Sequence, residues 1–136
     1  MGPEFKPLDG AEGWQISNPP ILQMAALRAS LEIFDEAEMP ALRAKSEKLT
    51  GYLELLIDEI GDDRISIVTP RDPDQRGCQL SIRVKNAGRS LHESILARGV
   101  YADWREPDVI RVAPVPLYNS FTDVYRFAQI LRECLA

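Results

Sequence analysis

The chain has few of the residues from which metal sites, disulfides and nucleophilic active sites are made. Its 136 residues include two cysteines, Cys78 and Cys134, and a single histidine, His92. The cysteines form no CxxC pair and no cluster with histidine, so a structural zinc site has no ligands and both residues are interpreted as reduced thiols. His92 stands in the polar pattern of a short helix, which predicts a solvated residue and a poor general base. No Ser/His/Asp or Cys/His arrangement can be built around it.

The sequence also lacks a long apolar run and an excess of positive charge. No segment approaches the roughly 18 apolar residues that a membrane span needs, and the start lacks the basic-then-apolar pattern of a secretory signal. The formal net charge is -5, whereas nucleic acid and anionic membranes attract a positive surface. We therefore expect a cytoplasmic protein whose partners include neither nucleic acid nor a membrane.

Composition and periodicity indicate one domain that begins with two helices. Residues 1–9 show no periodicity and are interpreted as a leader or a remnant of cloning, whereas 10–136 is predicted to be the domain. Apolar residues recur at helical spacing over 21–37, which predicts a long and largely buried helix. A second helix is expected to open at Pro40 and to end at Gly61.

Beyond Asp62 the pattern changes to short β-rich segments that alternate with helices. Strands are expected over 64–69, 78–84, 100–104 and 109–113, and helices over 90–98 and 120–135. Ser120 and Asp123 have the spacing of a capping box at the start of the last helix. Helices gathered over one face of a mostly antiparallel sheet of about four strands make an α+β two-layer sandwich.

One arginine, Arg111, stands in the middle of an apolar strand, in the segment VIRVAPVPLYNSF at 109–121. Burial of an unpaired guanidinium is so unfavourable that this position implies a fixed anionic partner. The partner is either the carboxylate of a ligand or a structural ion pair with an acidic residue such as Asp103 or Glu106. Two prolines follow at alternate positions, which end sheet pairing and predict a stiff, exposed rim.

A second candidate site precedes the first helix, in the segment GWQISNPP at 13–20. A helix N-terminus carries unpaired N–H groups and a partial positive charge, so such a loop can hold a phosphate. The commoner alternative is that Ser17 or Asn18 only caps the helix. Two aromatics elsewhere, Trp104 and Tyr118, either line a pocket or belong to the core.

These segments resemble the C-terminal part of kynureninase. The resemblance rests on GWQISNPPIL at 13–22, ASLEIF at 29–34, LTGYLE at 49–54, RGCQL at 76–80 and IRVAPVPLYNSF at 110–121, in the family's order. It implies the small C-terminal domain, over 10–136, of a pyridoxal-phosphate enzyme of the aspartate-aminotransferase fold type. Kynureninase is a homodimer that hydrolyses L-kynurenine to anthranilate and L-alanine, a reaction of tryptophan catabolism and NAD biosynthesis.

The resemblance also implies roles for individual residues. Arg111 matches the family arginine that binds the α-carboxylate of the substrate. Asn18 matches the asparagine that reaches the cofactor phosphate from the neighbouring subunit. Trp14 stands where the family has an aromatic, and we expect it to contribute to the cofactor site through its neighbours. The expected partners are therefore the large domain of the same enzyme, a second subunit and L-kynurenine.

No lysine of the sequence matches the family residue that forms the Schiff base with pyridoxal phosphate. Lys6, Lys45, Lys48 and Lys85 occur in unrelated contexts, and in the family this lysine lies in the large domain. The resemblance thus implies a fragment that is inactive alone. A free-standing noncatalytic domain that binds an acidic metabolite or a partner protein through Arg111 is the alternative. A relative of cysteine desulfurase is a third possibility, against which the segment at 13–20 argues.

Overall fold

The computed structural model describes residues 4–135, and it divides into two compact units, Met1–Ala37 and Glu38–Ala136. The residues 1–3 of the predicted leader lie outside the described residues. No described helix is both long enough and apolar enough to cross a membrane.

The first unit contains a short 3-10 helix, η1 (Ala11–Trp14), and the helix α1 (Ile21–Ala37). The predicted bounds of α1 are confirmed, but the expectation that it is largely buried is wrong, because none of its residues is buried. In this unit η1 is the only other described element, so nothing within the unit covers the apolar side chains of α1. Six of them are exposed: Ile21, Leu22, Met24, Leu27, Leu31 and Ile33.

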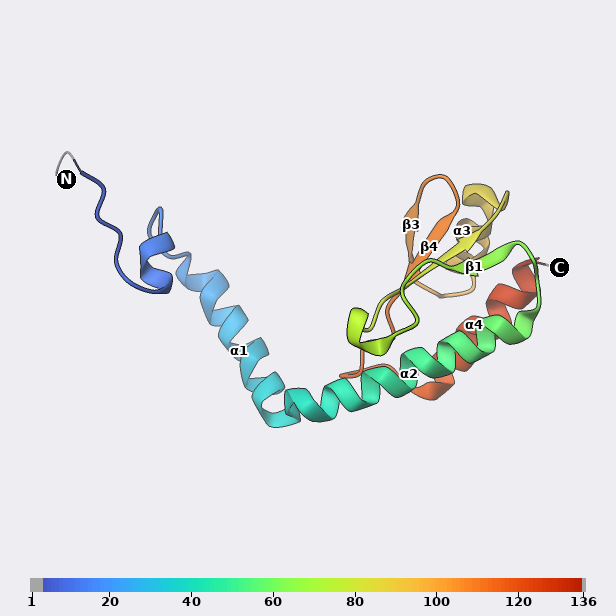
Figure 1. Ribbon diagram of the computed structural model, residues 1–136, viewed down its shortest axis with the longest axis horizontal. Coiled ribbons are helices and arrows are strands. Elements are labelled where there is room, and N and C mark those ends of the chain that lie inside the picture. The colour runs from blue at the N-terminus through green and yellow to red at the C-terminus, as the bar shows by residue number, and fades with distance from the viewer. Residues whose placement is uncertain (1–3, 136) are drawn as a thin grey trace. The chain divides into compact units, whose positions relative to one another are not determined.

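The second unit is a four-stranded sheet with helices on one face, as the sequence predicts. Its elements in chain order are α2 (Met39–Ile60), β1 (Ile65–Ile67), η2 (Pro73–Gln75), β2 (Leu80–Val84), α3 (Gly88–Ala97), β3 (Asp103–Arg105), β4 (Val109–Val112) and α4 (Phe121–Leu135). The strands lie in the order β1-β2-β4-β3, and each neighbouring pair is antiparallel. Figure 1 shows α2 and α4 side by side along the sheet.

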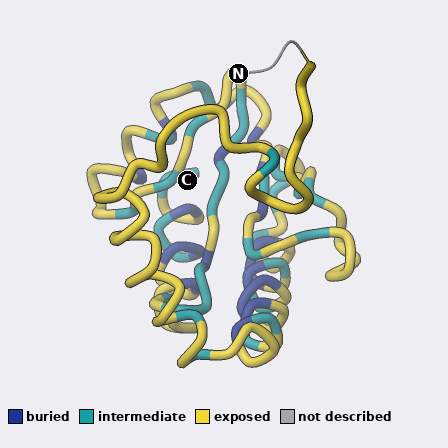
Figure 2. Tube along the Cα trace, turned by 90° about the vertical axis from the view of Figure 1, so that its left-hand side faces the viewer, coloured by how far each residue is buried: buried dark blue, intermediate teal, exposed yellow. Residues whose placement is uncertain are grey.

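The core lies between the sheet and the helices. Alternate residues of β2 point inward, so Leu80, Ile82 and Val84 are fully buried, and Ile110 of β4 joins them. They pack with apolar residues of α2, α3 and α4, among them Leu53. Figure 2 shows the buried residues gathered in this interior. The residues between them, Ser81 and Arg83 for example, lie on the opposite face, which no described helix of the unit covers.

Local signals in the sequence set the helix ends. The helix α2 ends at Gly61, which adopts a left-handed conformation with φ 67° and donates its N–H to the backbone carbonyl of Asp58. At the start of α4, the Ser120 N–H donates to Asp123 Oδ2 at 2.8 Å, and the Asp123 N–H donates to Ser120 Oγ at 3.3 Å. The predicted capping box is therefore confirmed.

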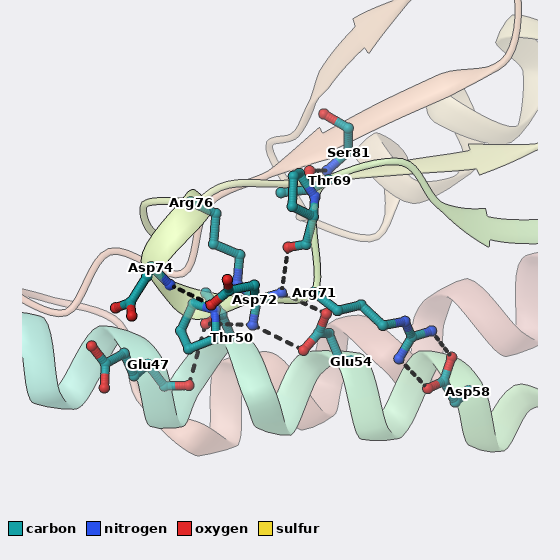
Figure 3. A network of polar contacts seen from close by, with 12 residues as sticks. Glu47, Thr50, Glu54, Asp58, Thr69, Arg71, Asp72, Asp74, Arg76 and Ser81 are labelled. Atoms are coloured by element: carbon teal, nitrogen blue, oxygen red, sulfur yellow. Dashed lines mark hydrogen bonds and ion pairs between the residues drawn. The ribbon is translucent and has the colours of Figure 1, made fainter.

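The polar loop at 70–77 is anchored to α2 by a buried ion pair that the sequence did not reveal. The Arg76 side chain is 4% exposed and its partner Glu54 is 12% exposed. Arg76 Nη1 and Nη2 donate to the two carboxylate oxygens of Glu54 at 2.5 and 2.9 Å, as Figure 3 shows. A second pair in the same view, Arg71 with Asp58, is exposed.

We expect Glu54→Ala to lower the free energy of unfolding by about 3 kcal/mol, because it leaves the buried Arg76 charge without its carboxylate partner. Asp58→Ala is the matched control, since it removes the carboxylate of an exposed pair on the same helix and is expected to cost at most about 1 kcal/mol. Urea unfolding of the two variants measures both values. Equal losses would contradict a structural role for the Arg76 pair.

Candidate functional site

The strand register places Arg111 on the uncovered face of the sheet, which we call the open face. Arg111 of β4 lies opposite Ser81 on one side and Asp103 on the other. The neighbouring row on the same face contains Arg83, Val109 and Arg105. Three arginines of three different strands therefore share the open face: Arg83, Arg105 and Arg111.

The expectation that Arg111 is buried is wrong, because 32% of its side chain is exposed. Side chains alternate between the faces of a strand, so Ile110 enters the core whereas Arg111 points away from it. The apolar neighbours of Arg111 in the sequence belong to the other face of the sheet. The arginine keeps contact with solvent and remains accessible to a ligand.

The carboxylate of Asp103 accepts hydrogen bonds from two arginines. Arg111 Nε donates to Asp103 Oδ2 at 2.6 Å, and Arg111 Nη2 donates to the same oxygen. Arg105 Nε also donates to this oxygen, at 2.9 Å. The predicted ion pair with Asp103 is therefore present, whereas Glu106 instead accepts from the indole of Trp104 at 2.9 Å. Because the pair is exposed, it does not exclude a ligand.

These contacts hold the pKa of Asp103 below its ordinary value. The hydrogen bond from Arg111 is the largest cause, and Arg105 adds to it. Asp103 is therefore ionised at neutral pH. Because its pKa is lower in the folded state, the stability contributed by this pair is present above the unfolded-state pKa and is lost as the pH falls through the lowered value.

The chain after β4 is held in place rather than left as an exposed rim. Pro114 is buried, which contradicts the expectation of an exposed segment. The Val115 N–H donates to Asn119 Oδ1 at 2.9 Å, and Lys45 Nζ of α2 donates to the Pro116 carbonyl at 2.7 Å. Prolines end the sheet pairing as predicted. Side chains from α2 and from the turn itself then form hydrogen bonds with backbone groups that the sheet does not pair.

The other aromatic candidates lie away from Arg111. Tyr118 lines a groove of about 590 Å³, to which Tyr101 and Val112 contribute and Arg111 does not. Trp104 packs against the core, next to His92 with ring centroids 6.0 Å apart. His92 Nε2 lies 2.9 Å from the Ala102 carbonyl oxygen and donates to it. The expectation of a solvated histidine is wrong, since a half-buried ring with this bond is a structural residue.

The predicted phosphate-binding residues lie in the first unit. Trp14 ends η1 and is 87% exposed, and Asn18 is exposed just before α1. The Pro20 carbonyl accepts the N–H of Met24 at 3.0 Å, so Pro20 occupies the cap position of α1. Within residues 4–135, neither the Ser17 nor the Asn18 side chain forms a hydrogen bond. The capping alternative is therefore wrong.

The family model described as the kynureninase C-terminal domain matches residues 42–131. The chain belongs to the kynureninase C-terminal domain family. This finding confirms the resemblance noted in the sequence, and it favours that interpretation over a free-standing noncatalytic domain.

Relatives named kynureninase cover nearly the whole chain. It is 60% identical over 131 residues to the protein of Myxococcus xanthus, a match that covers 96% of this chain and 31% of that protein. It is 61% identical over 132 residues to the protein of Xanthomonas campestris pv. campestris, covering 95% of this chain and 31% of that protein. The chain thus spans about a third of the length of these kynureninases.

A solved structure titled NifS-like protein shares the fold. The TM-score is 0.71 at 21% sequence identity, and the match covers 96% of this chain and 38% of that one. The predicted α+β architecture of the aspartate-aminotransferase type is consistent with this likeness. The sequence did not predict that Arg83 and Arg105 share the open face with Arg111, because their common face follows only from the strand register.

We expect the pKa of Asp103 to rise toward its ordinary value in Arg111→Ala, because the largest cause of its depression is removed while Arg105 remains. An NMR titration of the side-chain carboxyl carbons of the chain measures this pKa. Asp123 is the internal control, since Ser120 lowers its pKa and Arg111 does not. An unchanged Asp103 titration would show that the Arg111 contact is absent in solution.

Proposed function

We propose that this chain supplies the substrate-carboxylate clamp and one phosphate contact of a kynureninase. The enzyme hydrolyses L-kynurenine to anthranilate and L-alanine with pyridoxal phosphate. The observation that carries the proposal is the partly exposed guanidinium of Arg111 on the open face. The resemblance matches this residue with the family arginine that binds the substrate carboxylate. The proposal is supported by membership of the family and by the chemistry of the residues described above.

The charge distribution around Arg111 favours an anionic ligand. With Asp103 ionised, its cluster with Arg105 and Arg111 keeps a formal positive charge, since two guanidinium groups face one carboxylate. A guanidinium fork matches the planar geometry of a carboxylate and forms two charge-assisted hydrogen bonds with it. A clamp of this kind orients the amino acid and lowers the entropic part of the barrier.

The loop before α1 fits the phosphate of the cofactor. The Asn18 amide has no partner within residues 4–135, and the first described backbone bond into α1 comes from Met24, so the N–H groups of Ile21 and Leu22 stay available. Trp14 lies exposed in the same loop region. When bound, pyridoxal phosphate supplies the electron sink for the reaction, and this chain contributes a phosphate contact through Asn18.

The proposed active site is composite. Lys45 is committed to the Pro116 carbonyl, and none of the lysines matches the Schiff-base residue of the family. We infer that the lysine comes from the large domain, that a second subunit completes a homodimer in the cytoplasm, and that 10–136 alone is inactive. The exposed apolar side chains of α1 support such a partner, because a surface of this kind favours burial against other protein.

In the full-length enzyme we expect Arg111→Ala to lower kcat/KM for L-kynurenine at least about a hundredfold, which corresponds to about 3 kcal/mol of lost transition-state stabilisation. Arg83→Ala is the matched control, because Arg83 lies on the same face but pairs with Asp108. Steady-state kinetics of both variants measure the effect. A wild-type kcat/KM in Arg111→Ala would remove the basis of the proposed function.

We expect Asn18→Ala to weaken the binding of pyridoxal phosphate by the full-length enzyme about tenfold, because a hydrogen bond to the charged phosphate is lost. Titration of the apoenzyme, followed by the absorbance of the bound cofactor, measures the dissociation constant. Gln23→Ala removes an exposed amide side chain within α1 and is the control. Equal affinities of the Asn18 variant and the control would exclude the phosphate contact.

A further inference from the structure

We propose that Asp103 is a positioning residue for the substrate clamp. It holds Arg111 along one edge of the guanidinium, so that the other edge stays free for the carboxylate of the substrate. This inference rests on the proposed function of Arg111 and deepens it, because it assigns a role to the acidic residue beside the clamp.

The hydrogen bonds of Arg111 use only one of its two donor edges. A guanidinium carries five N–H groups, and a carboxylate can be bound along the Nε–Nη2 edge or along the Nη1–Nη2 edge. Nε and Nη2 of Arg111 both donate to Asp103 Oδ2. Within residues 4–135, Nη1 forms no hydrogen bond. The Nη1–Nη2 edge is therefore available to the two oxygens of a ligand carboxylate.

The sheet fixes the place of Asp103 beside Arg111. The two residues are directly opposite each other in the antiparallel pair of β3 and β4, which brings their Cβ atoms to roughly 5 Å. On the other side of Arg111 the register places Ser81, a neutral side chain that cannot form an ion pair. Asp103 is thus the acidic residue that the register presents to the guanidinium.

Arg105 keeps Asp103 from turning toward an incoming ligand. Its Nε donates to the same Oδ2 atom at 2.9 Å, so the carboxylate is held from two sides. The second arginine also leaves the cluster with a formal positive charge, which a substrate carboxylate would neutralise. Asp103 orients the clamp without cancelling its attraction for an anion.

The positioning role predicts a separation of kcat from KM. Without Asp103 the long Arg111 side chain gains rotational freedom on an exposed face, so the bound carboxylate is less well oriented and kcat falls. The same change removes a negative charge from the cluster, so attraction for the substrate is not weakened and KM does not rise. When rates are calculated per mole of enzyme with bound cofactor, a loss of folded enzyme alone does not lower kcat.

The experiment is a double-mutant cycle in the full-length enzyme with Asp103→Ala, Arg111→Ala and the double variant. We expect Asp103→Ala to lower kcat about tenfold without raising KM, and to change kcat/KM less than about twofold when Arg111 is already replaced. Asp103→Asn keeps an oxygen that accepts from Arg111, and it is expected to recover part of kcat. Asp108→Asn is the control, because its carboxylate pairs with Arg83 on the same face.

The outcomes separate this inference from the proposed function. Full activity of Arg111→Ala would overturn both. If Arg111→Ala loses activity, the clamp stands and two results would still overturn the positioning role. One is a wild-type kcat in Asp103→Ala, and the other is an undiminished effect of Asp103→Ala in the double variant. Should Asp103→Ala fail to give soluble enzyme, Asp103→Val decides, because valine has no acceptor for Arg111 and suits a strand. A lowered kcat without a raised KM supports the role, and a wild-type kcat rejects it.

Discussion

One-sided cover of the sheet is the constraint from which the candidate site follows. The helices α2, α3 and α4 pack on the same face, so adjacent residues of β4 have opposite fates: Ile110 fills the core and Arg111 reaches solvent. The charged Arg111 can therefore stand between apolar residues of β4 without being buried. A buried guanidinium would need a complete set of hydrogen-bonding and charged partners, because its burial is unfavourable. The open face can carry arginines that are only partly satisfied, and a partly satisfied arginine can bind a ligand.

The site depends on local structure to an unusual degree for a sheet. Arg111 and Asp103 belong to the hairpin of β3 and β4, so their pairing follows once the hairpin register is set. The long-range contacts instead fix the chain beyond the site, where Lys45 of α2 binds the Pro116 carbonyl. This contact joins the end of β4 to the helix layer. The orientation of Arg111 is thus set by the sheet, and its surroundings are set by the helix layer.

The sequence predicted the layers of the fold, the pairing of Arg111 with Asp103 and the features that depend on neighbours in the chain, and it missed several features that depend on tertiary contacts. The bounds of α1 and the capping box of Ser120 follow from spacing and from residues next to the helix ends. The exposure of α1 could not be predicted, because an apolar pattern shows that a helix face favours burial but not whether the segment that buries it is present. The pair of Arg76 with Glu54 joins a loop to a helix, and no local pattern announces it.

Fold and function are separable in the second unit. Its core is formed by residues of the covered face, whereas the Arg111 and Asp103 side chains lie outside it and contribute through an exposed pair, which is worth little to stability. The buried pair of Arg76 has the reverse character, since it anchors a loop and is largely shielded from solvent. A substitution on the open face therefore changes the chemistry offered to a ligand while the core keeps its packing. This separation allows the second unit to fold around α2 and the sheet and still present on its open face an arginine with a free donor edge.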